Sequence, residues 1–187
     1  MKPTNTIPNY KVALDKRNRT RAVANDIFTP PSATRILFPY LDRDWVIWEC
    51  CWGEGHMAQA LQQEGFKVVG GKDEDIFFSQ TKYAFDAIVT NPPYSKQLRN
   101  RMLELIASYD KPFAVLLRLE HLGGQGSHRI FRSRDLELII PSGRIHFLTP
   151  SGRANNTFGN LWVTRGLRTG ALRDQSAAYF VPYQSNS

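Results

Sequence analysis

Residues 45–70 constrain the fold of this chain more than any other stretch. Two short apolar runs, at residues 45–50 and 67–70, are too short for helices and are bounded by glycine, which is typical of buried strands. Residues 56–64 between them carry apolar side chains at helical spacing, and Gly65 is suited to end that helix. A strand, a glycine turn, a helix and a second strand form the βαβ unit of a doubly wound parallel sheet. The sequence therefore predicts an α/β fold.

Further strands and helices continue this pattern along the chain. Short apolar runs predict strands, and amphipathic spacing predicts helices. Ser32 is suited to cap the first of these helices, and residues 123–134 and 149–158 are expected to be polar loops. We predict strands over residues 85–89, 113–117, 136–140, 144–148 and 161–164, and helices over residues 33–41 and 96–109.

The length of 187 residues, of which 42% are hydrophobic, suits one domain with a sizeable core. Residues 1–22 mix Pro, Asn and Thr with basic side chains and lack apolar periodicity, so we predict a flexible basic N-terminal arm. We expect the folded domain to span residues 23–175 and a C-terminal tail to span residues 176–187.

The chain carries 24 Lys and Arg against 17 Asp and Glu, a net charge of +7, so its field attracts polyanions such as nucleic acids. Mild basicity is also common in soluble domains, and charge alone leaves both interpretations open. The two cysteines, Cys50 and Cys51, are adjacent, and a disulfide between neighbours is strained, which suits a reducing cytoplasm. No apolar run approaches the roughly 20 residues that cross a bilayer. We therefore expect a cytoplasmic protein without membrane contact.

Polar residues follow the predicted parallel strands at the ends where open α/β sheets bind their ligands. Glu49 ends the first strand, Gly53-x-Gly55 follows it, and an acid after the second strand is suited to bind ribose hydroxyls. The glycines allow a nucleoside cofactor to approach the backbone closely. A Gly-x-Gly turn also occurs wherever a strand meets a helix closely, so this signal alone leaves a structural interpretation open.

The most specific motif is Asn91-Pro92-Pro93-Tyr94, which stops the predicted strand at residues 85–89 abruptly. The exocyclic amine of adenine is a poor nucleophile, because its lone pair is delocalised into the ring. The Asn91 side-chain oxygen and the Pro92 carbonyl can accept hydrogen bonds from both N–H groups and free that lone pair, while Pro93 locks the turn. Tyr94 offers a face on which an extruded base can stack. An Asx turn that only ends a strand is the alternative.

On these residues the chain resembles the adenine-N6 DNA methyltransferases that depend on S-adenosyl-L-methionine, of the small type found in phages and mobile elements. The resemblance runs from about Asp26 to Thr164, and the stretch from Asn91 to Tyr94 matches the catalytic motif of the family residue for residue. It implies a Rossmann-like methyltransferase fold over residues 23–175, with a mostly parallel doubly wound sheet and an antiparallel edge strand.

The resemblance also assigns residues to the cofactor. Residues 28–31 are similar to the segment that embraces its methionine part, and residues 49–55 resemble the first motif of the family. Bulky Trp52 stands where the family has a smaller residue and is expected to narrow the cofactor pocket. The implied cofactor-binding residues are Phe28, Thr29, Pro30, Glu49, Cys50, Gly53, Gly55, Asp73, Asp75 and Phe77, and the implied catalytic residues are Asn91, Pro92, Pro93 and Tyr94.

The activity that the resemblance implies is methyl transfer to the N6 amine of adenine in DNA, with limited sequence discrimination. Arg129, Arg132 and Arg134 are candidate contacts to DNA, with a solvated charged face as the alternative. The same motif resembles that of enzymes that methylate adenine in RNA or the glutamine amide of proteins. A nucleic-acid-binding module with this fold but without transfer activity is a further alternative, supported by Trp52. The histidines lack partners at metal spacing, so no metal site is expected.

Overall fold

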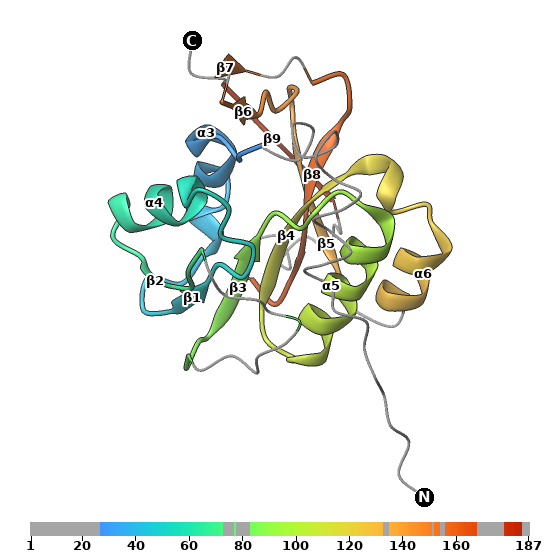
Figure 1. Ribbon diagram of the computed structural model, residues 1–187, viewed down its shortest axis with the longest axis horizontal. Coiled ribbons are helices and arrows are strands. Elements are labelled where there is room, and N and C mark those ends of the chain that lie inside the picture. The colour runs from blue at the N-terminus through green and yellow to red at the C-terminus, as the bar shows by residue number, and fades with distance from the viewer. Residues whose placement is uncertain are drawn as a thin grey trace, which may run out of the picture.

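The computed structural model describes residues 27–72, 77, 83–132, 135–150, 152–153, 156–167 and 178–184, and the predicted N-terminal arm lies outside them. A seven-stranded sheet with helices packed against it dominates the fold (Figure 1). The strands are β1 (Val46–Trp48), β2 (Lys67–Val69), β3 (Ala87–Thr90), β4 (Phe113–Arg118), β5 (Glu137–Pro141), β6 (Leu148–Thr149), β7 (Gly152–Arg153), β8 (Asn160–Arg165) and β9 (Ala178–Val181). The helices are α3 (Pro31–Arg35), α4 (His56–Gln63), α5 (Lys96–Ser108) and α6 (Gln125–Phe131), with 3-10 turns η1 (Phe38–Tyr40) and η2 (Leu119–His121).

The order of strands in the main sheet is β2-β1-β3-β4-β8-β5-β9. β2, β1, β3 and β4 pair in parallel, β8 runs antiparallel to both of its neighbours, and β9 is parallel to β5. The mostly parallel, doubly wound sheet that the sequence predicts is confirmed. The antiparallel strand lies inside the sheet rather than at its edge, because β5 and β9 continue the pairing beyond it.

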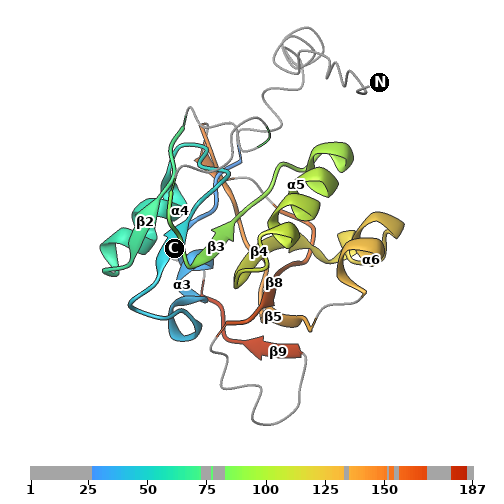
Figure 2. The same ribbon diagram turned by 90° about the horizontal axis from the view of Figure 1, so that it is seen from below.

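Alternate side chains of the central strand β4 point into two separate hydrophobic cores. Phe113, Val115 and Leu117 belong to the core that α5 and α6 cover, whereas Ala114 and Leu116 belong to the core that α3 and α4 cover. Figure 2 shows these two groups of helices on opposite sides of the sheet. Burial on both faces explains why this run of the sequence is continuously apolar instead of alternating with polar residues.

Residues 123–134 contain a helix where the sequence predicts a polar loop. This helix, α6, packs against α5 and buries Ile130 and Phe131 at 4% and 8% exposure. Gly126 permits the close approach, since an added Cβ there would lie 2.2 Å from Asn100 Nδ2. Glycine has low helix propensity, so the local sequence favours a loop and the packing against α5 overrides it.

The strand predicted over residues 144–148 is corrected by the structure. Within this segment only Leu148 pairs, as part of the short β6–β7 hairpin. Ile145 and Phe147 are 0% and 4% exposed. The alternating apolar pattern therefore reflects burial against the sheet and not membership of it.

The C-terminal segment contributes to the sheet, although the sequence places residues 176–187 in a tail. Ala178–Val181 forms β9, which pairs with β5. Tyr183 follows it, and the Tyr183 hydroxyl lies 3.1 Å from Ser32 Oγ. Ser32 is thus engaged with the C-terminal segment, and Pro30, not Ser32, is the N-cap of α3. The partner strand β5 lies about 40 residues earlier in the chain, and pairing over such a separation leaves no local sequence signal.

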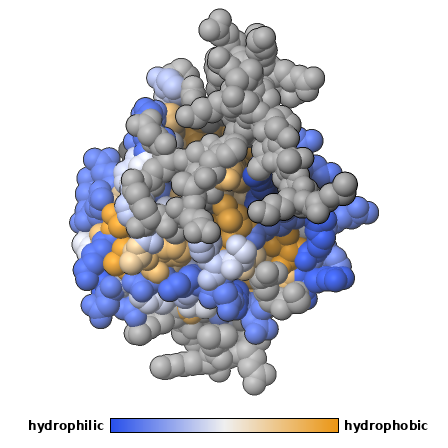
Figure 3. Space-filling model, turned by 60° about the horizontal axis from the view of Figure 1, so that its bottom comes forward, coloured by the Kyte–Doolittle hydropathy of each residue, from blue (hydrophilic) through white to orange (hydrophobic). Residues whose placement is uncertain are grey.

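Hydrophilic residues surround most of the face shown in Figure 3, and hydrophobic ones gather toward its middle. Three large hydrophobic side chains are exposed in the described part of the chain: Leu119 at 59%, Phe158 at 42% and Phe180 at 78%. None of the helices among the described residues combines the length and the hydropathy needed to span a membrane.

Gly70 follows β2 at a point where the backbone leaves no room for a side chain. Its φ is +133°, and an added Cβ would lie 2.3 Å from the carbonyl oxygen of Glu49. We predict that Gly70→Ala lowers the free energy of unfolding by roughly 2–4 kcal/mol, because backbone strain and overpacking add. Gly65 is the matched control, since its φ is +92° but nothing lies within 4 Å of an added Cβ. Gly65→Ala should cost about 1–2 kcal/mol. Urea denaturation compares the two variants, and equal losses would contradict the prediction.

Candidate active site

The carboxyl ends of β1, β3 and β4 meet at one edge of the sheet, as the sequence predicts. Glu49 follows β1, Asn91 follows β3, and Arg118 ends β4. Because these strands are parallel neighbours, their ends lie side by side. The site is therefore assembled from three segments that are far apart in the sequence.

The carboxyl group of Glu49 is buried at the end of β1, with 2% exposure. It accepts hydrogen bonds from Thr90 Oγ1 at 2.6 Å and from the Cys51 amide at 2.9 Å. Burial raises the pKa of Glu49 from 4.5 to about 7, and the two hydrogen bonds oppose this rise. Near neutral pH the group therefore stands close to the midpoint of its titration.

A small pocket of about 50 Å³ lies beside Glu49 and Asn91. Phe28 lines one side of this pocket. Two backbone hydrogen bonds with Leu148, of 2.8 and 2.9 Å, hold Phe28 in place. The Phe28 ring also stacks on the His56 ring, with the centroids 5.0 Å apart. The structure thus brings together, around one pocket, the predicted cofactor residues Phe28, Thr29, Glu49 and Gly53.

Other predicted cofactor residues have different surroundings. Cys50 is 8% exposed and belongs to the core that α5 and α6 cover. Pro30 is the N-cap of α3, and the ring of Phe77 lies 4.8 Å from the guanidinium of an α5 arginine. Asp73 and Asp75 lie outside the described residues. The structure therefore places only part of the predicted set around the pocket, and the cofactor role of all these residues stays a prediction.

Trp52 occupies the space that two glycines leave free. An added Cβ at Gly55 would lie 2.8 Å from Trp52 Nε1, and one at Gly70 would lie 3.0 Å from the indole Cε3. The same indole is part of the pocket wall. The ring, rather than open space, thus lies over Gly55.

The side-chain amide of Asn91 is held at the tip of β3. Its Nδ2 donates to Thr29 Oγ1 at 3.1 Å and lies 3.5 Å from Tyr94 Oη. Its Oδ1 is buried and has no hydrogen-bond partner among the described residues. A buried acceptor without a partner is costly unless a ligand satisfies it. The amide is therefore oriented with its oxygen available to a donor from outside the chain.

Two contacts hold Tyr94 in the same loop, one to its backbone and one to its ring. Arg99 Nη1 donates to the Tyr94 carbonyl at 3.2 Å, and the Phe147 ring meets the Tyr94 ring edge-on at a centroid distance of 6.2 Å. Burial raises the pKa of Tyr94, so its hydroxyl stays protonated over the physiological range. Arg99 is only 9% exposed, and burial lowers its pKa. Its role in positioning Tyr94 has no signal in the sequence.

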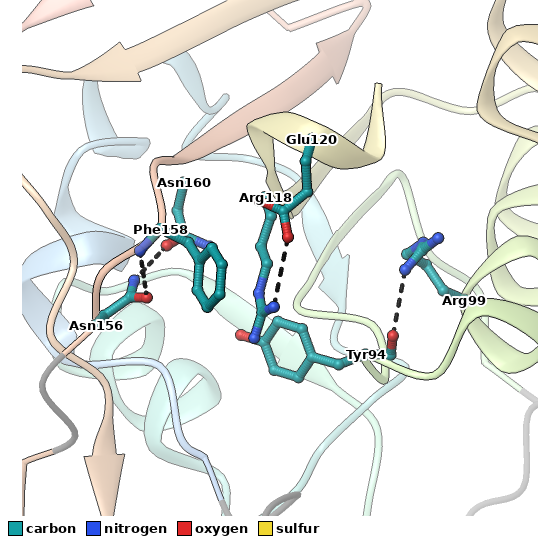
Figure 4. A network of polar contacts seen from close by, with 7 residues as sticks. All are labelled: Tyr94, Arg99, Arg118, Glu120, Asn156, Phe158 and Asn160. Atoms are coloured by element: carbon teal, nitrogen blue, oxygen red, sulfur yellow. Dashed lines mark hydrogen bonds and ion pairs between the residues drawn. The ribbon is translucent and has the colours of Figure 1, made fainter. Parts of the chain in front are cut away.

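Two further residues, Arg118 and Phe158, lie at this site and are not among the site residues that the sequence predicts. The guanidinium carbon of Arg118 lies 4.8 Å from the centroid of the Tyr94 ring and 4.2 Å from that of the Phe158 ring (Figure 4). Arg118 also pairs with Glu120 at 3.5 Å. The position of Arg118 at the end of a predicted strand could have indicated a place in the site. The sequence around Phe158 carries no such signal, because only the tertiary fold brings its loop close to Arg118.

The predicted nucleic-acid contacts lie on α6 and after it. Arg129 forms an ion pair with Glu104 of α5, and Arg132 is exposed just beyond the helix. Arg134 lies outside the described residues. In the described part of the chain, no group of three or more His, Cys, Asp or Glu side chains could hold a metal ion.

The strand order and the two helix layers around the sheet define a Rossmann-like α/β fold, which this chain shares with solved structures of methyltransferases. One solved structure similar to this chain is described as a class I S-adenosylmethionine-dependent methyltransferase from Listeria monocytogenes. The TM-score is 0.58 at 10% identity, over 94% of this chain and 72% of that one.

Two other similar structures come from restriction systems. One is described as a modification subunit of a type I restriction enzyme from Vibrio vulnificus YJ016, with a TM-score of 0.50, 12% identity and coverage of 95% of this chain. The other is the methyltransferase subunit of a type I restriction-modification system from Streptococcus thermophilus, with a TM-score of 0.50, 12% identity and coverage of 84% of this chain. The chain spans 51% and 47% of the lengths of these two proteins. No protein-family model and no curated protein matches the sequence.

The raised pKa of Glu49 predicts a stability that depends on pH. Between pH 4.5 and about 7 the folded protein keeps a proton on Glu49 that the unfolded chain has released. The free energy of unfolding should therefore fall as pH rises through this interval, by on the order of 3 kcal/mol. Glu49→Gln lacks the titrating group and should lose this part of the pH dependence. Urea denaturation of both proteins at several pH values measures the difference, and parallel profiles would refute the assignment.

Proposed function

We propose that this chain is an S-adenosyl-L-methionine-dependent methyltransferase that acts on the N6 amine of adenine in DNA. The observation that carries this proposal is the buried, unpartnered Oδ1 of Asn91 beside the pocket that Glu49 lines. An acceptor in this position suits an N–H donor of a substrate, and Tyr94 next to it suits a planar one. The similarity in fold supports S-adenosyl-L-methionine as the methyl donor.

The pocket has features that the amino-acid end of this cofactor requires. Glu49 offers a buried acidic group to an ammonium ion, and Thr29 offers a hydroxyl. Gly53 has a φ of +54° and lets a ligand approach the backbone, while Phe28 supplies an apolar wall. When bound, the cofactor supplies a methyl group activated by a positively charged sulfur. The proposed contacts of its adenosine part are Asp73, Asp75 and Phe77.

The Asn91 loop orients and activates the amine in the proposed mechanism. One N–H donates to Asn91 Oδ1 and the other to the Pro92 carbonyl, which draws the nitrogen toward a tetrahedral geometry and makes its lone pair available. Thr29 holds the Asn91 amide from behind at 3.1 Å, Pro93 fixes the turn, and Tyr94 stacks on the base. Orientation supplies much of the rate. No general base is required beforehand, because the alkylated nitrogen loses its proton readily.

DNA is the proposed polymer for two reasons. The net charge of +7 favours a nucleic acid over a protein, and two proteins of similar fold are subunits of restriction systems. The arm at residues 1–22 and the arginines 129, 132 and 134 are proposed phosphate contacts, in which Arg129 is already partly neutralised by Glu104. We further propose limited sequence discrimination, a cytoplasmic location and a relationship to the small phage type.

Transfer of labelled methyl groups distinguishes the possible substrates. Duplex DNA, single-stranded DNA, RNA and a glutamine-containing peptide are each incubated with labelled S-adenosyl-L-methionine, and the modified atom is identified. The proposal expects N6-methyladenine in DNA. Label only in RNA or only on glutamine would reassign the substrate. Absence of cofactor binding in calorimetry would favour the inactive nucleic-acid-binding module, in which the Trp52 indole blocks the pocket.

Replacement of Asn91 tests the mechanism. Asn91→Ala removes the buried acceptor, and we expect the methyl-transfer rate to fall roughly 100-fold or more. Cofactor affinity, measured by calorimetry, should change little, because the Glu49 end of the pocket is untouched. Tyr94→Phe is the matched control, since it keeps the stacking ring and removes only a hydroxyl 3.5 Å from Asn91 Nδ2. It should retain most activity, and an Asn91→Ala variant as active as Tyr94→Phe would sink the mechanism.

A further inference from the structure

The Arg118 side chain fills the space between two aromatic rings beside the Asn91 loop. Its guanidinium carbon is 4.8 Å from the centroid of the Tyr94 ring and 4.2 Å from that of the Phe158 ring. Figure 4 shows the three side chains together. Both distances are within the roughly 6 Å over which a cation is attracted to an aromatic face. We call the space between the Tyr94 and Phe158 rings the aromatic slot. A side chain of the protein itself thus occupies this slot.

The two walls of the aromatic slot are fixed by the rest of the structure. Arg99 holds the Tyr94 carbonyl at 3.2 Å. The Phe158 amide donates to Asn156 Oδ1 at 3.1 Å, and Asn156 Nδ2 donates to the buried Asn160 Oδ1 at 2.6 Å. Phe158 nevertheless remains 42% exposed. The loop therefore presents a large apolar ring at the surface in a fixed position, which core packing does not explain.

The guanidinium group of Arg118 is flat, and a space between two aromatic rings favours flat groups. It can stack on aromatic faces, as a nucleobase does. Arg118 also forms an ion pair of 3.5 Å with Glu120, in which the two side chains are 26% and 50% exposed. An ion pair that solvent reaches contributes little stability. Arg118 can therefore leave the slot without breaking a buried network.

We propose that Arg118 is a displaceable occupant of the aromatic slot. In the free protein its guanidinium separates Tyr94 and Phe158, and the substrate base takes its place. This inference rests on the proposed function and narrows it to a nucleic-acid substrate. A nucleobase offers a large flat surface to both rings, whereas the side-chain amide of glutamine offers a small one. Once displaced, the charge of Arg118 is available to a phosphate of the same substrate.

Nuclear magnetic resonance of the Arg118 side chain tests the occupancy directly. Protons held over an aromatic face resonate upfield, so the Arg118 N–H signals of the free protein should be shifted upfield and should be absent from Arg118→Lys. Phe158→Leu should move them part of the way back. Saturation with adenosine should move them to the positions of an exposed arginine. Unshifted signals in the free protein, or shifted signals that adenosine leaves unchanged, would overturn the proposal.

Affinity for adenosine, which carries no phosphate, measures the competition for the aromatic slot once saturating S-adenosyl-L-methionine fills the proposed cofactor pocket. Arg118→Ala empties the slot, and we expect adenosine to bind roughly tenfold tighter than to the wild type. Arg43→Ala is the matched control, because Arg43 also stacks on a phenylalanine, Phe66 at 4.4 Å, and pairs with Glu64 at 3.0 Å. Arg43 precedes β1, at the opposite edge of the sheet, so its replacement should not change the affinity. Equal, weaker or undetectable binding by Arg118→Ala would contradict the displacement.

Two outcomes separate this inference from the proposed function. If the protein methylates DNA but its Arg118 signals are unshifted, the proposed function is supported and the displaceable role of Arg118 is contradicted. If adenosine displaces Arg118 but none of the four substrates is methylated, the role of Arg118 is supported and the proposed function is contradicted.

Discussion

The hydrogen bond from Thr90 to the buried carboxyl group of Glu49 joins the two halves of the site. It spans 2.6 Å between the ends of β1 and β3. Glu49 lines the pocket, and Asn91 follows Thr90 directly at the tip of β3. A change in the position of one strand end is therefore transmitted to the other. The parallel pairing of β1 and β3 makes this bond possible, because only parallel neighbours end at the same edge of a sheet.

One buried polar atom of the site has no hydrogen-bond partner among the described residues, while hydrogen bonds hold the groups around it. Asn91 Oδ1 has no partner among the described residues, whereas Asn91 Nδ2 is anchored on Thr29. Tyr94 is fixed through its backbone by Arg99. An orphaned buried acceptor in rigid surroundings is preorganised for a donor, since no rearrangement is needed when that donor arrives.

Sequence reasoning succeeded where the signal is local and failed where it is not. The strand at β4 is recognisable because burial on both faces requires a continuous apolar run. The helix α6 is not, because Gly123, Gly124 and Gly126 suggest a loop and only the packing against α5 stabilises the helix. The pattern of residues 144–148 resembles a strand although it mainly records burial. Hydrophobic periodicity and secondary-structure propensity report whether a side chain is buried, and they do not show which strand its segment pairs with.

The sequence by itself determined the α/β fold, the end of β3 at Asn91 and the residue types that could activate an amine. These follow from chain-local chemistry, since apolar runs form buried strands and prolines end them. Only the tertiary structure decided that β8 lies inside the sheet, that Trp52 covers Gly55, and that the guanidinium of Arg118 stacks between two rings. Each of these depends on contacts between segments far apart in the chain, which long-range packing selects and no local pattern encodes.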